Sequence, residues 1–266
     1  MALAFLLDPE TPKNDGSFRP VKVVAREGSI VWAKPGAPVT LSTSHCAQEI
    51  IEAIVRALAP ACPDRAMAGW GRRFRIAIKG DDPRNGQPFI WHMFHARPGA
   101  GASSGGDGWH GSGEWHSTGG LKFGSIEIVE TRFPLYFRRH EYRANSGGSG
   151  RYTGGAGVDL DLEVETATPC KVNAAGDGAR HGAAGMLGGE DGAPHRYLLR
   201  APGKRPRVLR TKEEGIEVPV GAVFEIHSAG GGGWGPPGER EQAAKDYDRR
   251  NGYTTKSGGK SSKAKA

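Results

Sequence analysis

The sequence predicts an α+β fold that is rich in β-structure, with antiparallel sheets, one main amphipathic helix and long glycine-rich loops. Residues 158–164 alternate apolar with acidic side chains, as in a strand with one buried and one exposed face. The clearest helical periodicity lies at residues 45–58. Glycine and proline supply 42 and 18 of the 266 residues, well above the usual share, so turns and tight connections must be frequent.

The first part of the chain is expected to contain short strands and then the main helix. Residues 21–24 and 29–32 are apolar pieces between turn signals and have the composition of short strands. From His45 to Leu58, apolar residues recur at helical spacing, which predicts a helix packed in the core, capped by Ser44 and ended by Pro60. The apolar face consists of Ala47, Ile50, Ile51, Ile54 and Leu58.

The rest of the chain is expected to be mostly strands. Residues 73–79 alternate as a strand, and the following loop at 79–86, with Asp81 and Asp82, has the composition of a solvated turn rather than of a metal site. Residues 89–94 form another apolar piece. The further predicted elements are strands at 132–143, 158–164 and 223–227 and a mostly polar helix at about 239–251.

We expect one domain over residues 1–253, with an α+β part to about residue 130, a β-rich part over about 131–235 and the terminal helix. Residues 254–266 form a Lys/Ser/Gly tail that is expected to be disordered. Its four lysines account for four of the seven net positive charges, and charges of both signs are interspersed elsewhere, so a nucleic-acid partner is not expected.

No membrane association is expected either. No apolar run approaches the roughly 18 residues of a membrane span, and the first residues lack the features of a signal peptide. The three cysteines, Cys46, Cys62 and Cys170, have no metal-binding spacing and suggest no disulfide framework. The expected compartment is therefore the cytoplasm.

The most unusual segment is residues 98–120, which contains nine glycines. Glycine at this density is expected where the backbone folds tightly or approaches another group closely. The segment has no phosphate-loop motif, and its Gly-Ala-Gly-Ala start at residue 99 lacks the strand and helix of a dinucleotide site.

Histidines and carboxylates cluster in and before this segment. Glu114 and His116 would share one face of an extended strand, which makes them, with His110, weak candidates for metal ligands. No spacing here matches a zinc signature. The alternatives are histidines that form hydrogen bonds in a substrate loop and exposed histidines without a role.

Four blocks, in order, resemble the hydantoinase B/oxoprolinase family. They cover nearly the whole chain, to about residue 253. The blocks are residues 7–29 with Asp8-Pro9, Asn14-Asp15-Gly16 and Glu27-Gly28-Ser29; Gly99-Ala100-Gly101-Ala102 with Asp107-Gly108 and His116; Ser146-Gly147-Gly148-Ser149-Gly150-Arg151-Tyr152 with Gly154-Gly155; and Gly230-Gly231-Gly232-Gly233-Trp234-Gly235 with Glu239-Arg240 and Asn251-Gly252.

The sequence departs from the family pattern in two ways. It resembles only the C-terminal half of the B-type subunit, and the other half carries the Asp and His positions associated with a metal in related ketone carboxylases. The family's glycine loop usually ends His-x-His-Met-Thr-Asn, whereas residues 114–119 here read Glu-Trp-His-Ser-Thr-Gly. Both departures put catalysis by this chain alone in doubt.

The resemblance implies an ATP-dependent enzyme of two kinds of subunit. An A-type ATPase subunit phosphorylates a carbonyl of a small-molecule substrate, and the B-type subunit acts on the product. In hydantoinases and oxoprolinase this second step opens a cyclic amide, and in acetone and acetophenone carboxylases it joins an enolate to activated carbonate. ATP would act through the partner, and a divalent metal would belong to the complex rather than to this chain alone.

The resemblance also suggests site residues. Gly99, Gly101, Ala102 and Gly108 would present backbone N–H groups to an anion, a common way to stabilise developing charge. His116 would transfer a proton and Asp107 would orient it, although both could equally be structural.

The leading hypothesis is a split B-type subunit of a cyclic amide hydrolase, which works beside a separate N-terminal-half chain and the A-type subunit. The alternatives are a ketone carboxylase subunit and a non-catalytic structural subunit or remnant. A half-subunit should expose an apolar surface where the other half packs.

Overall fold

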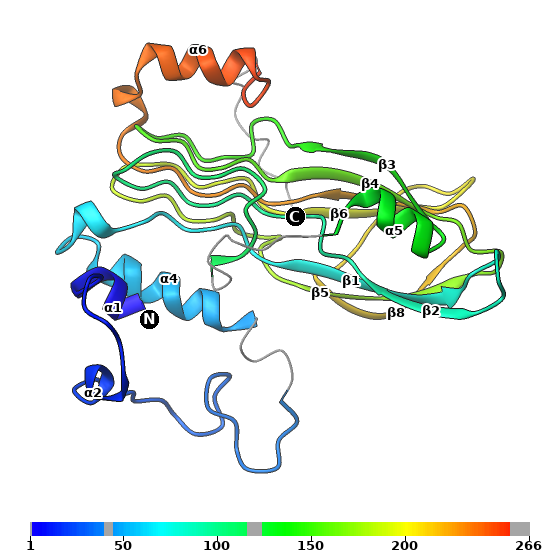
Figure 1. Cartoon of the computed structure of the whole chain (residues 1–266), viewed down its shortest axis with the longest axis horizontal. Coiled ribbons are helices and arrows are strands. Elements are labelled where there is room, and N and C mark those ends of the chain that lie inside the picture. The colour runs from blue at the N-terminus through cyan, green and yellow to red at the C-terminus, as the bar shows by residue number, and fades with distance from the viewer. Residues whose placement is uncertain (1, 40–44, 116–123, 256–266) are drawn as a thin grey trace.

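The computed structural model describes residues 2–39, 45–115 and 124–255 (Figure 1). Its strands form two antiparallel sheets, one in the order β2-β1-β5-β8 and one in the order β3-β4-β9-β6-β7. The first sheet contains β1 (Phe74–Asp81), β2 (Pro88–His92), β5 (Cys170–Gly176) and β8 (Lys212–Val218). The second contains β3 (Leu135–Tyr142), β4 (Val158–Val164), β6 (Arg196–Arg200), β7 (Arg207–Val208) and β9 (Val223–His227).

Helices lie mainly at the two ends of the chain, so the α+β, strand-rich class predicted from the sequence is confirmed. The described helices are α1 (Ala2–Leu7), α2 (Asp15–Phe18), α4 (Ala47–Leu58), α5 (Ile126–Arg132) and α6 (Gln242–Arg250), with short 3₁₀ turns at Pro63–Arg65 and Pro237–Glu239.

The two sheets pack face to face around one apolar core. Along β4, every second side chain is buried, as the alternation of residues 158–164 predicts. Leu160 on β4, Ile76 on β1 and Phe224 on β9 are completely buried in this core. β1 pairs with β5, so strands from both sides of residue 130 share one sheet.

Several predicted elements are confirmed and others are wrong. The strands at 73–79, 158–164 and 223–227 correspond to β1, β4 and β9. The strand predicted over 132–143 begins only at Leu135, because Ser125 caps α5 and this helix ends at Arg132. Residues 21–24 pair with no strand in the described part of the chain, and residues 29–32 form a single bridge between Ser29 and Trp32.

The main helix is confirmed as α4. Of its predicted core face, Ile51, Ile54 and Leu58 do pack against a buried apolar cluster, whereas the prediction is wrong for Ile50. Gln48, Glu52 and Val55 are buried, whereas Ile50 is 45% exposed. Polar contacts explain this orientation: the Gln48 amide donates to the carbonyl oxygens of Trp70 and Gly71, and Glu52 binds Arg72. These satisfied contacts allow Gln48 and Glu52 to be buried on the same helix as the apolar residues. The predicted cap, Ser44, lies outside the described residues.

The glycine-rich segments form a bundle of extended chains between α4 and α6, seen in Figure 1 as evenly spaced wavy ribbons. Its centre is the segment 230–235. The amides of Gly230 and Gly233 donate to the carbonyls of Ala193 and Glu190 in one neighbouring segment. The amides of Gly231 and Trp234 donate to the carbonyls of Gly155 and Tyr152 in another segment. In each pair, the donors are three residues apart and so are the acceptors. Gly232 donates in a third direction, to Gly69. This repeat of three is that of the polyproline II conformation, whose N–H groups point outward to neighbours rather than along the chain.

The bundle requires glycine because its backbones touch. A Cβ at Gly231 would overlap the carbonyl oxygen of Ala100, and one at Gly230 would overlap that of Ser146. The glycine density of the sequence thus reflects close approach of backbone to backbone.

We expect Gly231→Ala to lower the free energy of unfolding by about 3 kcal/mol or more, because the new methyl group forces neighbouring segments apart. Urea denaturation measures the change. Gly238→Ala is the matched control, since nothing lies within 4 Å of a Cβ there, and it should change stability by less than about 1 kcal/mol. Equal stability of the two variants would contradict the packing described for the bundle.

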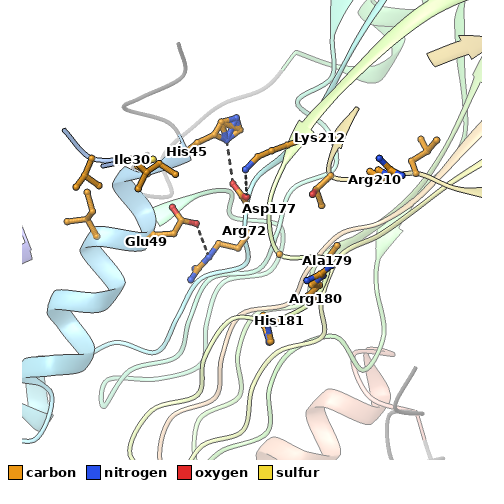
Figure 2. A pocket seen from close by; sticks show the side chains of 17 residues that line it. Ile30, His45, Glu49, Arg72, Asp177, Ala179, Arg180, His181, Arg210 and Lys212 are labelled. Carbon is orange, nitrogen blue, oxygen red and sulfur yellow. Dashed lines mark hydrogen bonds and ion pairs between the residues drawn. The ribbon is translucent and has the colours of Figure 1, made fainter. Parts of the chain in front are cut away.

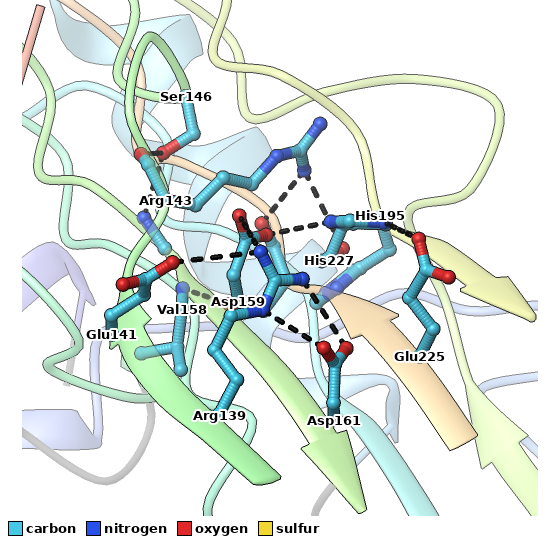
Figure 3. Close-up of polar contacts among 12 residues, drawn as sticks. Arg139, Glu141, Arg143, Ser146, Val158, Asp159, Asp161, His195, Glu225 and His227 are labelled. Carbon is cyan, nitrogen blue, oxygen red and sulfur yellow. Dashed lines mark hydrogen bonds and ion pairs between the residues drawn. The ribbon is translucent and has the colours of Figure 1, made fainter. Parts of the chain in front are cut away.

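Buried polar side chains join the bundle to the sheets (Figure 3). The Arg143 guanidinium donates to the carbonyl oxygens of Pro194 and Ser228, at 2.8 and 2.9 Å. The His195 Nδ1 accepts the Ala229 N–H at 3.0 Å, and its Nε2–H therefore donates to the carbonyl of Arg72. These bonds satisfy backbone groups where the regular ladders end.

His195 predicts a pH dependence of stability. Burial lowers its pKa to about 3, from 6.5, so the folded protein does not take up the proton that the unfolded chain binds below about pH 6.5. Its contribution to stability is present above pH 6.5 and is lost as the pH falls toward 3. Between pH 6 and 4, His195→Gln should reduce the pH dependence of the unfolding free energy by about 1.4 kcal/mol per pH unit. His181→Gln, an exposed control, should leave it unchanged.

Candidate functional site

A cleft of about 860 Å³ lies between α4 and the chain that follows β5 (Figure 2). The segment 177–182 and the residues that lead into β8 form one side, and α4 forms the other. Ile30 and Val31, from the segment before α4, also line it.

Backbone contacts to the bundle and the sheet fix the two walls. The amide of Gly71 donates to the carbonyl of Gly99 in the bundle, which places Arg72 at the base of the cleft. Asp177 donates its amide to the carbonyl of Arg73, so the segment after β5 begins beside β1. Gly182 packs so closely that a Cβ there would overlap the carbonyl oxygen of Gly192. The cleft is therefore built on rigid backbone.

Both carboxylates of the cleft are paired. Glu49 lies 3.1 Å from Arg72, which also binds the buried Glu52 at 2.6 Å. Burial opposes the charge of Arg72, but its hydrogen bond to Glu52 and the nearby carboxylates raise its pKa. Burial raises the pKa of Glu49. The second carboxylate, Asp177, lies 3.0 Å from the Lys212 ammonium group.

His45 faces Asp177 from the start of α4. Its Nδ1 is 3.6 Å from the Asp177 carboxylate and makes no hydrogen bond within the described structure. Burial lowers the pKa of His45, against the opposing effect of Asp177, so the ring is neutral near pH 7 and able to accept a proton.

Three basic side chains line the other part of the cleft without an ion pair in the described part of the chain: Arg180, His181 and Arg210. Ile30, Ile50 and Leu209 supply apolar surface. A cleft with this lining fits a small molecule that has an apolar body and a negatively charged group.

The structure places Asp107 away from this cleft, in a contact with the C-terminal helix region. Arg240 binds both oxygens of Asp107, at 2.7 and 2.9 Å, and also binds Asp248. The amide of Thr153 donates to the same Asp107 carboxylate. His116, the proton-transfer candidate, lies outside the described residues. The catalytic roles of Asp107 and His116 stay predictions.

The residues of the expected anion loop lie in the bundle. The amides of Gly99, Ala102 and Gly108 donate to the carbonyls of Ala229, Gly232 and Thr153, respectively. At Gly101, a Cβ would overlap the carbonyl oxygen of Ala68. In this arrangement, the N–H groups of Gly99, Ala102 and Gly108 stabilise the bundle, and anion binding by the loop stays a prediction.

Of the three weak metal candidates, His110 and Glu114 have different partners in the structure, and His116 lies outside the described residues. His110 accepts the Ala156 amide with Nδ1 and packs against Tyr253, whereas Glu114 lies 3.5 and 3.3 Å from the guanidinium groups of Arg73 and Arg75. No group of three or more His, Cys, Asp or Glu residues within the described ranges has the geometry to hold a metal. His110 and Glu114 thus do not fit a shared metal ion, and no chemical step is assigned to one.

Sequence reasoning missed the cleft because its residues come from distant segments. His45, Arg180 and Arg210 are separated by 30 or more residues and share no motif. The one available signal was the mixed charge of residues 177–181 after a glycine-ending strand, which is not specific.

The family model described as "Hydantoinase B/oxoprolinase" matches residues 1–237. The chain belongs to the hydantoinase B/oxoprolinase family. Within the described ranges, no helix is long and apolar enough to span a membrane, and Cys46, Cys62 and Cys170 are all free thiols.

Two relatives show how much of a family protein this chain represents. It is 32% identical over 262 residues to the beta subunit of the caprolactamase of Pseudomonas jessenii, a match that covers 92% of this chain and 43% of that protein. It is 27% identical over 247 residues to the putative B subunit of a D-/L-hydantoinase from a Pseudomonas species, covering 92% and 40%. The chain thus spans less than half the length of these relatives.

Solved structures share the fold. A nucleotide-free acetone carboxylase superposes with a TM-score of 0.80 at 20% identity, covering 96% of this chain and 38% of that one. The ATP-dependent caprolactamase from Pseudomonas jessenii superposes with a TM-score of 0.78 at 26% identity, covering 96% and 45%. The fold of this hydantoinase B-family chain is therefore shared with one region of much longer proteins.

Substitution of Arg240 tests whether its ion pairs with Asp107 and Asp248, here called the Arg240 clamp, stabilise the fold. Arg240→Met should lower the free energy of unfolding by about 3 kcal/mol, because it leaves the largely buried Asp248 carboxylate unpaired. Arg249→Met, on α6 next to Asp248, is the matched control, since its pair with Asp246 is half-exposed and should contribute less than about 1 kcal/mol. Urea denaturation of both variants decides, and equal losses would contradict the clamp.

Proposed function

We propose that this chain is the C-terminal part of the B-type subunit of an ATP-dependent enzyme that opens a small cyclic amide, and that the cleft beside α4 forms part of its substrate site. The observation that carries the proposal is the cleft itself. Arg180 and Arg210, which make no ion pair within the described ranges, face apolar Ile30, Ile50 and Leu209 there. Among the relatives, the caprolactamase is named for a cyclic amide and the hydantoinase for another.

ATP acts in this proposal at an A-type partner, where it activates the amide carbonyl by phosphorylation. The sequence of this chain has no Walker A motif, which agrees with placing the nucleotide on the partner. A separate chain that corresponds to the rest of the B-type protein completes the assembly.

The residues of the cleft have distinct roles. Arg180 and Arg210 bind the negative charge on the activated carbonyl group, because a guanidinium donates two parallel hydrogen bonds to such a group. The apolar wall holds the methylene groups of the ring and limits the access of water. Counted from the phosphorylated amide, the reaction consumes two water molecules. The first adds to the activated carbon and the C–N bond breaks, which leaves an amine and an acyl phosphate; the second hydrolyses the acyl phosphate to a carboxylate and inorganic phosphate.

His45 is the candidate general base. Its neutral ring accepts a proton from the attacking water, and the nearby Asp177 carboxylate stabilises the imidazolium that results. The proton then passes to the departing nitrogen. No other histidine of the cleft lies within 4 Å of a carboxylate in the described structure.

The test uses the complex recovered from its native cells through a tag on this chain. We expect ATP-dependent formation of the ring-opened amino acid from caprolactam, 5-oxoproline or hydantoin, measured by mass spectrometry. Arg180→Ala and Arg210→Ala should each raise KM about tenfold through the loss of a charge-assisted hydrogen bond. His45→Gln should lower kcat at least tenfold with little change in KM.

Arg205→Ala is the matched control, since Arg205 is exposed and lies outside the cleft. Product formation unaffected by the three cleft variants would show that the cleft is not the site. ATP-dependent incorporation of bicarbonate into a ketone, without lactam opening, would favour the carboxylase alternative. An assembled complex with neither activity would favour a structural role for this chain.

A further inference from the structure

Residues 9–39, here called the N-terminal arm, leave the body of the protein between α1 and α4 (Figure 1). Each hydrogen bond that the described structure gives this arm is made within the arm or to Asp8, as in Gly28 N–H to Trp32 O and Ala37 N–H to Lys34 O. The arm is thus fastened at its ends and otherwise little supported by the body.

Both ends of the arm are firmly anchored. Before it, Leu6 of α1 is completely buried against α4, where Val55 is completely buried as well. After it, α4 is fixed by the contacts of Gln48 and Glu52 described above. Between these anchors, Ile30 and Val31 reach the wall of the cleft.

The arm exposes large apolar side chains along its length. Ile30, Val24 and Val23 are 87%, 81% and 80% exposed. The others that are exposed are Phe18, Val21, Val31, Trp32 and Val39. On the neighbouring helix, Ile50 continues this surface at the cleft. Large apolar side chains exposed at this density along one segment mark a site of protein contact, since each aliphatic side chain that becomes buried contributes about 1.5–3 kcal/mol.

We propose that the N-terminal arm is the docking surface for a separate polypeptide that corresponds to the part of the longer B-type proteins that this chain does not span. This inference rests on the proposed function for the identity of the assembly. The chain covers 43% of the beta subunit of the caprolactamase and 45% of the caprolactamase chain of known structure, while 96% of this chain superposes on the latter. The shared region is therefore nearly complete, and more than half of the relative is additional polypeptide joined to it.

Charge argues against a second copy of this chain as the occupant. The arm carries the basic residues Lys13, Arg19, Lys22, Arg26 and Lys34 against the acidic residues Glu10, Asp15 and Glu27. Two arms packed against each other would bring like net charges together. A partner surface with acidic groups around an apolar centre complements the arm better than a second arm does. A partner bound there would also cover the cleft at Ile30 and Val31.

The experiment compares the tagged chain with its Val23→Asp/Val24→Asp variant in native cells, with captured proteins identified by mass spectrometry and masses measured by light scattering. We expect the unchanged chain to carry one copy of a polypeptide that aligns with the unmatched part of the B-type relatives. The double variant should retain at least tenfold less of it, because two charges enter the apolar contact.

Ile128→Asp is the control, an exposed isoleucine on α5, which lies at the far end of the sheets from the arm (Figure 1), and it should retain the partner fully. Thermal unfolding of the purified chain should be the same for all three proteins, since the substituted side chains are exposed. Four results would overturn the proposal: undiminished capture by the arm variant, an arm-dependent dimer of this chain alone, arm-dependent capture of only an ATPase, or no partner.

The outcome is separable from that of the proposed function. An assembly that depends on the arm but opens no cyclic amide supports the docking surface and contradicts the function. Lactam opening by complexes that form equally well with the arm variant supports the proposed function and contradicts the docking surface.

Discussion

The hydrogen bonds that radiate from Gly230–Gly233 hold together segments that no sheet or helix connects. Successive amides of this stretch donate to Ala193, Gly155, Gly69 and Glu190, so three distant parts of the chain, near residues 69, 155 and 190–193, meet on one extended backbone. Polyproline II geometry makes this possible because its amides point outward at three-residue intervals. Glycine is required because the backbones lie in contact, and side chains of Arg143, His195 and Ser228 satisfy the groups left over where the bundle joins the sandwich.

Backbone contacts with this bundle position residues of the candidate site. Arg72 follows a segment that is hydrogen-bonded into it at Gly69 and Gly71, and Arg180 precedes Gly182, which is packed against Gly192. The two sides of the cleft are therefore positioned by backbone that has little freedom to move, which suits preorganised binding. The wall formed by Ile30 and Val31 belongs instead to the arm, so the cleft has one side that a partner would complete.

Sequence patterns predicted the elements whose burial alternates cleanly. The acidic-apolar alternation of β4 and the compact apolar run of β9 gave correct strands, and four ordered blocks gave the family. β5, with Cys170, Val172 and Ala174 as its buried residues, was missed because small side chains give weak periodicity. The burial of Gln48 and Glu52 on α4 was missed because it depends on specific polar partners that lie more than 15 residues away. The cleft could not be found from spacing, since His45, Asp177 and Arg210 come from distant segments that only the tertiary structure, including the pairing of β5 with β8, brings to one cleft.

The central physical claim is that the glycine bundle is as firmly structured as the sheets, and amide hydrogen exchange of the native protein measures this directly. The account predicts that the amides of Gly230–Gly233 exchange as slowly as those of Leu160 and Ile226, which lie in the paired strands β4 and β9. Exchange of Gly230–Gly233 as rapid as that of the turn glycine Gly203 would contradict it, because the cleft would then lack a rigid support.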